Sequence, residues 1–137
     1  MCMGKIVIRT LELPDYDRPE EVIEWFCAAL GFSSSPAVDS IEGEILEQLA
    51  RAAYGGRGVS SSEFKFKKQV ARSTVIYHLN QFIDAGLVVK RGRKYYLRAT
   101  EMSKTIEEIE YDIQREMNRM LSAAREFDKL MERRLGR

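Results

Sequence analysis

Side chains that can bind a polyanion are concentrated in one stretch of this 137-residue chain. Residues 62–98 hold nine basic side chains against two acidic ones, a net charge of +7, whereas the whole chain carries +1. The nine are Lys65, Lys67, Lys68, Arg72, Lys90, Arg91, Arg93, Lys94 and Arg98. Such a concentration is typical of a nucleic-acid site, although a solvated basic face has the same composition. The charge therefore leaves both interpretations open.

Few other residues in the sequence could bind a metal ion or take part in catalysis. Two cysteines, Cys2 and Cys27, and one histidine, His78, fall short of the four ligands of a structural zinc site. Cys27 stands in an apolar run and fits a buried small side chain, and His78 fits a packing role. No nucleophile–base pair or paired carboxylates stand out, and the loop 55–58 lacks the Lys-Ser/Thr of a phosphate-binding loop. We therefore expect no enzyme activity, metal ion or cofactor.

Hydropathy excludes a membrane span in this sequence. The longest apolar run, residues 25–30, is far shorter than the roughly 20 residues that cross a bilayer. The first residues also lack the features of a secretory signal. We expect a cytoplasmic protein without a membrane partner. Its two Asn and four Gln, beside abundant Glu and Arg, resemble the composition of a thermophilic, archaeal protein.

The first 36 residues predict a strand and a helix. Residues 5–13 are rich in β-branched side chains and predict the strand. Asp17 is the expected N-cap of the helix, with Pro19 in its first turn and Gly31 as its C-terminal stop. Residues 33–36 then form the expected linker.

The middle of the chain predicts three helices followed by a hairpin. The first helix begins at Asp39 or Ser40 and ends before Tyr54. The second runs from Ser61 or Ser62 to about residue 68, and the third spans residues 72–85. Strands over 87–91 and 94–98 flank a tight turn at residues 92–93.

Residues 100–137 predict one long helix with an apolar seam. Its apolar residues alternate at spacings of four and three, as in a coiled coil, although Glu110 occupies an expected seam position. The pattern favours a dimer seam or a packed core, and the methionines also fit an adaptable partner groove. The seam residues are Ile113, Met117, Met120, Ala124, Phe127 and Met131.

The order of elements and two motifs resemble a known family. The run from Val70 to Val89, with Ser-Thr-Val-x-x-His-Leu and Ala-Gly-Leu-Val, resembles the recognition-helix segment of winged-helix transcriptional regulators of the ArsR and MarR type. The resemblance continues through residues 91–97 and covers about residues 39–99. It implies a mainly α fold with a small β hairpin (α+β), a winged helix-turn-helix. We expect an N-terminal strand-helix segment (1–36), a winged-helix domain (37–99) and a C-terminal coiled-coil dimerisation helix (100–137).

The resemblance implies double-stranded DNA as the partner. The third helix presents a free face to a major groove about 12 Å wide. Its expected contact residues are Arg72, Ser73, Thr74, Ile76, Tyr77 and Gln81. Arg91, Arg93 and Lys94 at the hairpin fit backbone or minor-groove contacts, or protection of an edge strand. Lys65 and Lys68 fit phosphate contacts or an ordinary amphipathic surface. For Tyr95 and Tyr96, one ring packed on the core and the other covering the hairpin fits better than base stacking.

From these patterns we expect a sequence-specific, homodimeric transcriptional regulator. One alternative is an architectural DNA-binding protein with little base preference, although such a protein is expected to spread its positive charge over several faces. Another is a winged helix that contacts only proteins. The sequence points to no particular small-molecule effector.

Overall fold

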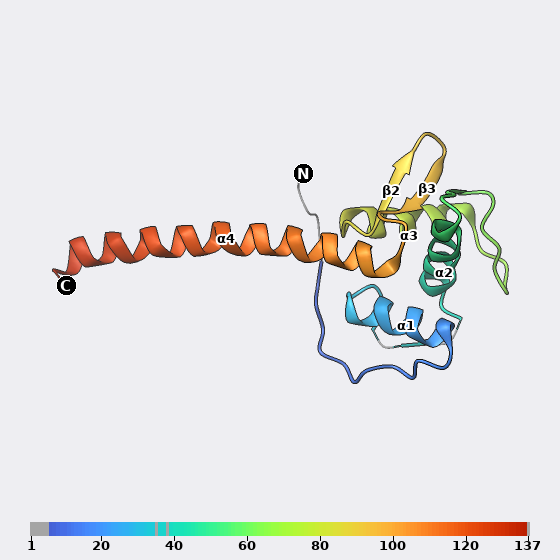
Figure 1. Cartoon of the computed structure of the whole chain (residues 1–137), viewed down its shortest axis with the longest axis horizontal. Helices are drawn as coiled ribbons and strands as arrows, with labels where there is room; N and C mark the ends of the chain where they lie inside the picture. The colour runs from blue at the N-terminus through green and yellow to red at the C-terminus, as the bar shows by residue number, and fades with distance from the viewer. Residues whose placement is uncertain (1–5, 35, 38, 137) are drawn as a thin grey trace. The chain divides into compact units, whose positions relative to one another are not determined.

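A computed structural model describes residues 6–34, 36–37 and 39–136 of the chain. The described residues form four helices and a three-stranded antiparallel sheet, in two compact units that divide between Thr105 and Ile106 (Figure 1). None of the described helices combines the length and apolarity needed to cross a membrane. The elements are α1 (Pro19–Ala29), α2 (Ile41–Tyr54), β1 (Val59–Ser60), α3 (Arg72–Asp84), β2 (Val88–Arg91), β3 (Lys94–Leu97) and α4 (Met102–Leu135).

Helix α2 is the centre of the first unit and contacts α1, α3, β1 and β3. The expected start at Asp39 or Ser40 is confirmed with Ser40 as the N-cap, whose hydroxyl accepts a hydrogen bond of 2.9 Å from the Gly43 amide. The apolar face is buried, with Ile45, Leu46 and Leu49 fully enclosed. Burial of these side chains removes apolar surface from water, which is the main force that assembles the unit.

Helix α1 begins at the expected Pro19 but without the expected cap. Arg18, rather than Asp17, occupies the N-cap, and no side chain caps the helix. Asp17 instead donates its amide to the side chain of Asp15 in the preceding turn. Gly31 adopts a φ of +81° after the helix, which confirms its role as the stop.

The expected N-terminal strand is wrong over its described part, residues 6–13. Among the residues that the structure describes, this segment has no neighbouring strand to complete a ladder of hydrogen bonds, and it runs beside α1 instead. Arg9 donates its amide to the Ala29 carbonyl, and the Trp25 indole donates to the Glu12 carbonyl at 2.7 Å. Residues of strand-like composition therefore lie extended against a helix.

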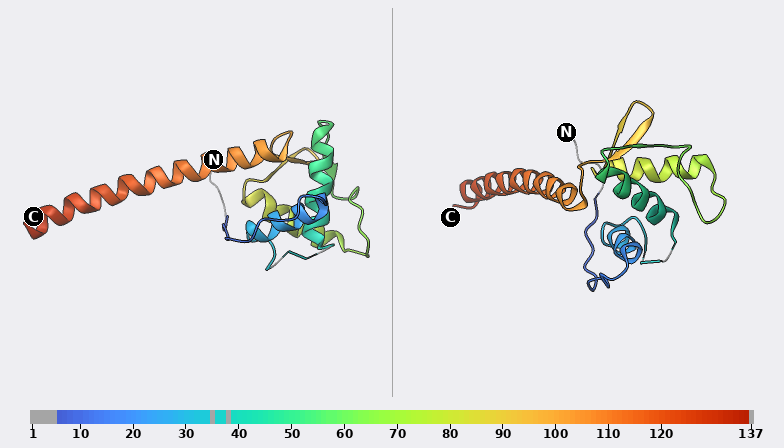
Figure 2. Two further views of the ribbon diagram at one scale, coloured as in Figure 1. Left: turned by 60° about the horizontal axis from the view of Figure 1, so that its bottom comes forward. Right: turned by 45° about the vertical axis from the view of Figure 1, so that its right-hand side comes forward.

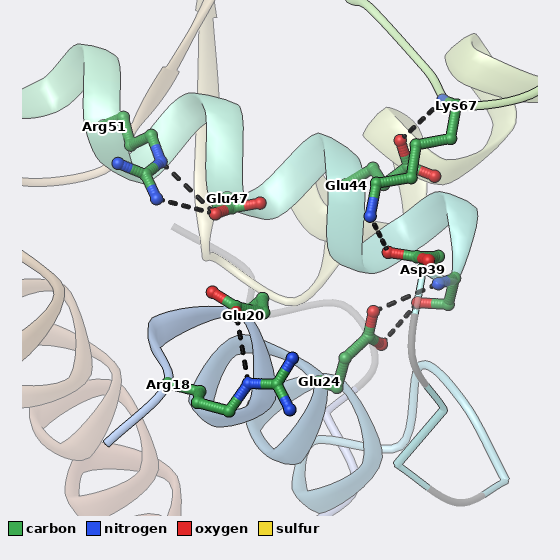
Figure 3. A network of polar contacts seen from close by, with 9 residues as sticks. Arg18, Glu20, Glu24, Asp39, Glu44, Glu47, Arg51 and Lys67 are labelled. Carbon is green, nitrogen blue, oxygen red and sulfur yellow. Dashed lines mark hydrogen bonds and ion pairs between the residues drawn. The ribbon is translucent and has the colours of Figure 1, made fainter. Parts of the chain in front are cut away.

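A buried carboxylate joins α1 to the start of α2 (Figure 3). Glu24 accepts hydrogen bonds from the Ser40 hydroxyl at 2.5 Å and from the Ser40 amide at 3.1 Å. No larger residue fits at position 43, because an added Cβ would lie only 2.2 Å from a Glu24 oxygen. Glycine therefore lets the buried carboxylate reach the helix terminus.

The expected helix from Ser61 or Ser62 to residue 68 is wrong. Residues 61–63 form a turn in which Glu63 and Ser60 bond to each other, and the chain is then non-helical up to α3. The Gln48 side chain holds both the amide and the carbonyl of Lys65, so these groups are not available to a helix. Phe64 is buried, which anchors the loop in the unit.

The sheet has the order β1-β3-β2 and contains one strand, β1, that the sequence did not predict. Val59 pairs with Tyr95 and Ser60 with Lys94, while the hairpin pairs Val88 with Leu97 and Arg91 with Lys94. The expected hairpin and its turn are confirmed, and Gly92 adopts a φ of +62° there. The hairpin turn projects away from the helices of the unit (Figure 2).

The expected third and final helices are confirmed. Helix α3 ends before Gly86, whose φ of +81° stops the helix as predicted. Helix α4 is continuous over 34 residues, with Gly136 after its end at a φ of +71°. The fold is thus mixed, with four described helices and one small antiparallel sheet.

The Glu24 carboxylate makes stability depend on pH in a definite direction. Burial raises the pKa of Glu24 above its ordinary value of 4.5, against the opposing hydrogen bonds from Ser40. As the pH rises from 4.5 through the raised pKa, the unfolded chain loses this proton before the folded chain does, and stability falls. We predict that Glu24→Gln removes this loss, measured by urea unfolding of both chains across that pH range.

Glu12→Gln serves as the control, because Glu12 is exposed. A difference between wild type and Glu24→Gln that stays constant with pH would contradict this account.

Candidate nucleic-acid interface

One side of α3 is exposed along its length. Val75, Leu79 and Phe82 bury the other side, as their spacing predicted. Four of the residues expected to contact DNA are exposed or half-buried on the first turns, namely Arg72, Ser73, Thr74 and Tyr77, and Tyr77 is 59% exposed. Ile76 is half-buried, and Gln81 is exposed one turn further along. The helix therefore offers hydrogen-bonding groups and a ring to a partner.

The beginning of α3 is not capped by a side chain. Ala71 is its N-cap residue and forms no such hydrogen bond, in contrast to the capped start of α2. The Thr74 and Val75 amides donate to the Ala71 carbonyl, so only the amides of Arg72 and Ser73 precede these bonds at the start of the helix. Uncapped amides and the helix dipole attract an anion such as a phosphate.

The hairpin turn carries the strongest exposed positive charge of the unit. Lys90, Arg91, Arg93 and Lys94 are all exposed. Within the described part of the chain, none of these four side chains is in an ion pair. Strand β2 packs against α3, so the hairpin belongs to the same structural body as the exposed helix face.

Two tyrosines position the cations of the hairpin. Tyr95 is buried and lies under the ammonium of Lys90, 5.4 Å from the ring centre. The guanidinium of Arg91 lies 5.1 Å from the ring centre of half-buried Tyr96. These cation–π contacts restrain the two side chains without neutralising them. The expectation that one ring packs on the core and the other covers the hairpin is confirmed, with Tyr95 in the core and Tyr96 beside Arg91.

Arg57 joins the interface through the unexpected strand β1. Arg57, Arg91 and Arg98 line a hollow of about 120 Å³ at the base of the hairpin, together with Tyr96 and residues of the following loop. The sequence interpretation treated residues 55–58 only as a loop and missed Arg57. The available signal was an arginine between glycines, but nothing in the sequence placed that loop beside the hairpin.

The lysines of the 61–71 loop differ in what they contact. Lys67 bonds to Asp39 at 2.6 Å, and its amide donates to Glu44 (Figure 3). The hydrogen bond to Asp39 raises the pKa of Lys67, whose exposed ammonium is therefore paired at the surface. Lys65 and Lys68 are exposed and form no ion pair with any described residue. Lys65 lines the same hollow as Asp39, Glu44 and Glu47, so Lys68 is the stronger candidate for a phosphate contact.

The seam residues lie on α4 in the second unit. Met117, Met120, Ala124 and Phe127 are exposed, while Ile113 and Met131 are half-buried. Leu121 and Leu130, each 45% exposed, lie beside the seam. Apolar side chains thus remain accessible along about three heptads of the helix.

The described side chains that could take part in metal or redox chemistry, Cys27 and His78, are packed against other residues of the chain. Cys27 is fully buried, and burial raises the pKa of its thiol, which therefore stays protonated. Cys2 lies outside the described residues. His78 is half-buried, with its Nε2 3.9 Å from Glu42 and its ring against Tyr77. Among the described residues, no three His, Cys, Asp or Glu side chains are grouped to hold a metal ion.

Comparisons of the chain with protein-family models, curated proteins and solved structures give no match. The candidate interface therefore rests on the residues of this chain alone.

The close approach of Gly58 to the Tyr96 ring, which lies beside Arg91, predicts that a larger residue at position 58 lowers the stability of the fold. A Cβ at Gly58 would lie 2.6–2.8 Å from three atoms of the Tyr96 ring, so the ring and Arg91 would have to move. We predict that Gly58→Ala lowers the free energy of unfolding by about 1–3 kcal/mol, measured by urea denaturation.

Ser62→Ala, at an exposed position, should stay within about 0.5 kcal/mol of wild type. An equally stable Gly58→Ala protein would show that Tyr96 is not fixed against this loop.

Proposed function

We propose that the chain is a sequence-specific, double-stranded DNA-binding protein that regulates transcription as a homodimer. The observation that carries this proposal is the combination, within one unit, of unpaired exposed cations on the hairpin turn and an exposed polar face on α3. Concentrated cations supply affinity for phosphates, and a polar helix face supplies selectivity among bases. A transcriptional regulator needs both.

The proposed arrangement is a winged helix in which α3 is the recognition helix and the β2–β3 hairpin is the wing. The hairpin follows α3 directly and packs against it. The preceding segment is a loop rather than the expected helix, so the first helix of a regular helix-turn-helix is not present before α3, and the proposal rests on α3 and the hairpin. In the major groove, Arg72 has the reach for a guanine edge, and Ile76 or Tyr77 suits a thymine methyl.

The distribution of acidic residues supports this orientation. In the described chain, Glu20, Asp39, Glu44 and Glu47 lie around α1 and the beginning of α2, in the hollow that Arg18, Lys65 and Lys67 also line (Figure 3). Residues 68–83, which follow this hollow along the chain, contain no acidic side chain. DNA would be repelled by the first surface and attracted by the second.

A homodimer is proposed from the exposed apolar seam of α4. Exposed Met and Phe side chains at heptad spacing gain stability when a second helix covers them. A two-fold dimer would present two recognition helices to an inverted repeat. Its half-sites would lie about 10 base pairs apart, or at a multiple of that spacing.

The test is a fluorescence-anisotropy titration at several salt concentrations. The DNA is a duplex selected by the protein from a randomised pool, with a scrambled duplex for comparison. We predict a preference of roughly a thousandfold or more for the selected duplex. Replacing Arg91 and Arg93 by Ala should weaken binding to both duplexes and reduce the slope of log affinity against log salt by about two. Arg72→Ala should mainly reduce the preference.

Arg51→Ala is the matched control, because Arg51 is an exposed arginine paired with Glu47 on α2. Equal binding to both duplexes would favour an architectural protein instead. Unchanged function after charge reversal at Arg91 and Arg93 would favour a module for protein contacts.

A further inference from the structure

Glu110 and Arg134 are the two charged residues that continue the apolar seam of α4 beyond its ends. From Ile113 to Met131 the seam alternates spacings of four and three, and the same alternation reaches Glu110 on one side and Arg134 on the other. Both are exposed, and neither forms an ion pair with any described residue. A partner that covers the seam must therefore also accommodate one negative and one positive group.

We propose that α4 pairs with α4 of a second copy in an antiparallel orientation, in a register centred on residue 122. This inference rests on the homodimer of the proposed function and adds its orientation and register.

The charges at the two ends carry the inference. In the antiparallel register, Glu110 of each copy meets Arg134 of the other, so both ends of the seam hold opposite charges. A parallel pair would place Glu110 against Glu110 and Arg134 against Arg134. Like charges in facing positions destabilise a coiled coil, and opposite charges set the orientation of its helices.

The charges along α4 follow the same direction as these two ends, with acidic residues gathered towards its beginning and basic residues towards its end. Residues 107–116 contain five acidic side chains and one basic, a net charge of −4. Residues 119–134 contain five basic and three acidic side chains, a net charge of +2. An antiparallel pair brings the acidic half of each helix beside the basic half of the other, which lowers the electrostatic energy of the dimer.

The sizes of the seam residues agree with this register. It pairs Ile113 with Met131, Met117 with Phe127, and Met120 with Ala124, each pair centred on residue 122. In the Met120–Ala124 layer, a small side chain faces a long flexible one, which fills the space between the helices. In a parallel pair Ala124 would face Ala124 and leave the layer underpacked.

Other antiparallel registers lose the charge match. A shift by one heptad in one direction places Glu110 against Phe127, and the opposite shift places Arg134 against Met117. Either shift leaves a charged group against an apolar one, which costs free energy. The centred register is the one that satisfies both ends.

A charge exchange tests the orientation in the full-length chain. In the antiparallel pair, Glu110→Arg alone and Arg134→Glu alone each create like charges at both ends. We expect each single substitution to raise the dimer dissociation constant about tenfold at low salt, measured by analytical ultracentrifugation. The double substitution restores opposite charges, so its dissociation constant should return close to that of wild type.

Arg125→Glu is the matched control for Arg134→Glu, and Glu126→Arg for Glu110→Arg, because each makes the same change of charge at an exposed position outside the seam. A parallel pair gives a different pattern, because each single substitution only exchanges one like-charged layer for another. Single substitutions without effect would therefore overturn the antiparallel orientation, as would a double variant no better than the singles. Circular dichroism confirms that each variant keeps its helix.

Cross-linking gives an independent readout in a Cys2→Ser, Cys27→Ala background. Leu121 lies beside the centre of the proposed register, so Leu121→Cys should be joined to its symmetry mate by a short bismaleimide. Ile113→Cys lies about 27 Å from its mate in that register and should stay unlinked. A rapid Ile113→Cys disulfide would demonstrate a parallel pair and overturn the orientation while leaving the dimer intact. A chain that sediments as a monomer would overturn the dimer and its orientation together.

Discussion

The buried face of α2 is the constraint on which the rest of the first unit depends. Ile45, Leu46 and Leu49 are inaccessible to solvent, and the helix that carries them contacts α1, α3 and two strands. Its polar residues also hold the surrounding loops, since Gln48 fixes Lys65 and Ser40 fixes Glu24. A shift of this helix would move both the loop before α3 and the strand that supports the hairpin.

Positive and negative side chains are unevenly distributed over the first unit, in part because ion pairs within the chain neutralise some of the lysines and arginines. Lys67 is the central case, because Asp39 pairs with its ammonium while Glu44 accepts a hydrogen bond from its backbone amide. The hairpin cations are instead restrained by tyrosine rings, which hold a guanidinium or ammonium group without cancelling its charge. The result is an acidic surface beside α1 and a basic hairpin next to the exposed polar face of α3.

Elements whose formation depends on local residues were predictable from the sequence. Ser40 caps α2, Gly86 and Gly92 supply positive φ angles, and the heptad pattern defines α4. Elements that depend on distant partners were not predictable. Residues 6–13 have strand-like composition but no strand to pair with, and the side chain of Gln48 replaces the helix expected around Lys65. Strand β1 and the place of Arg57 likewise exist only because β3 lies beside them.

The central claim is that two copies of this chain act together on one DNA site. The most direct measurement is sedimentation equilibrium of the full chain on a single duplex that it has selected, with increasing protein. The account predicts saturation at two chains per duplex. A plateau at one chain, or continued addition of chains in proportion to duplex length, would contradict it.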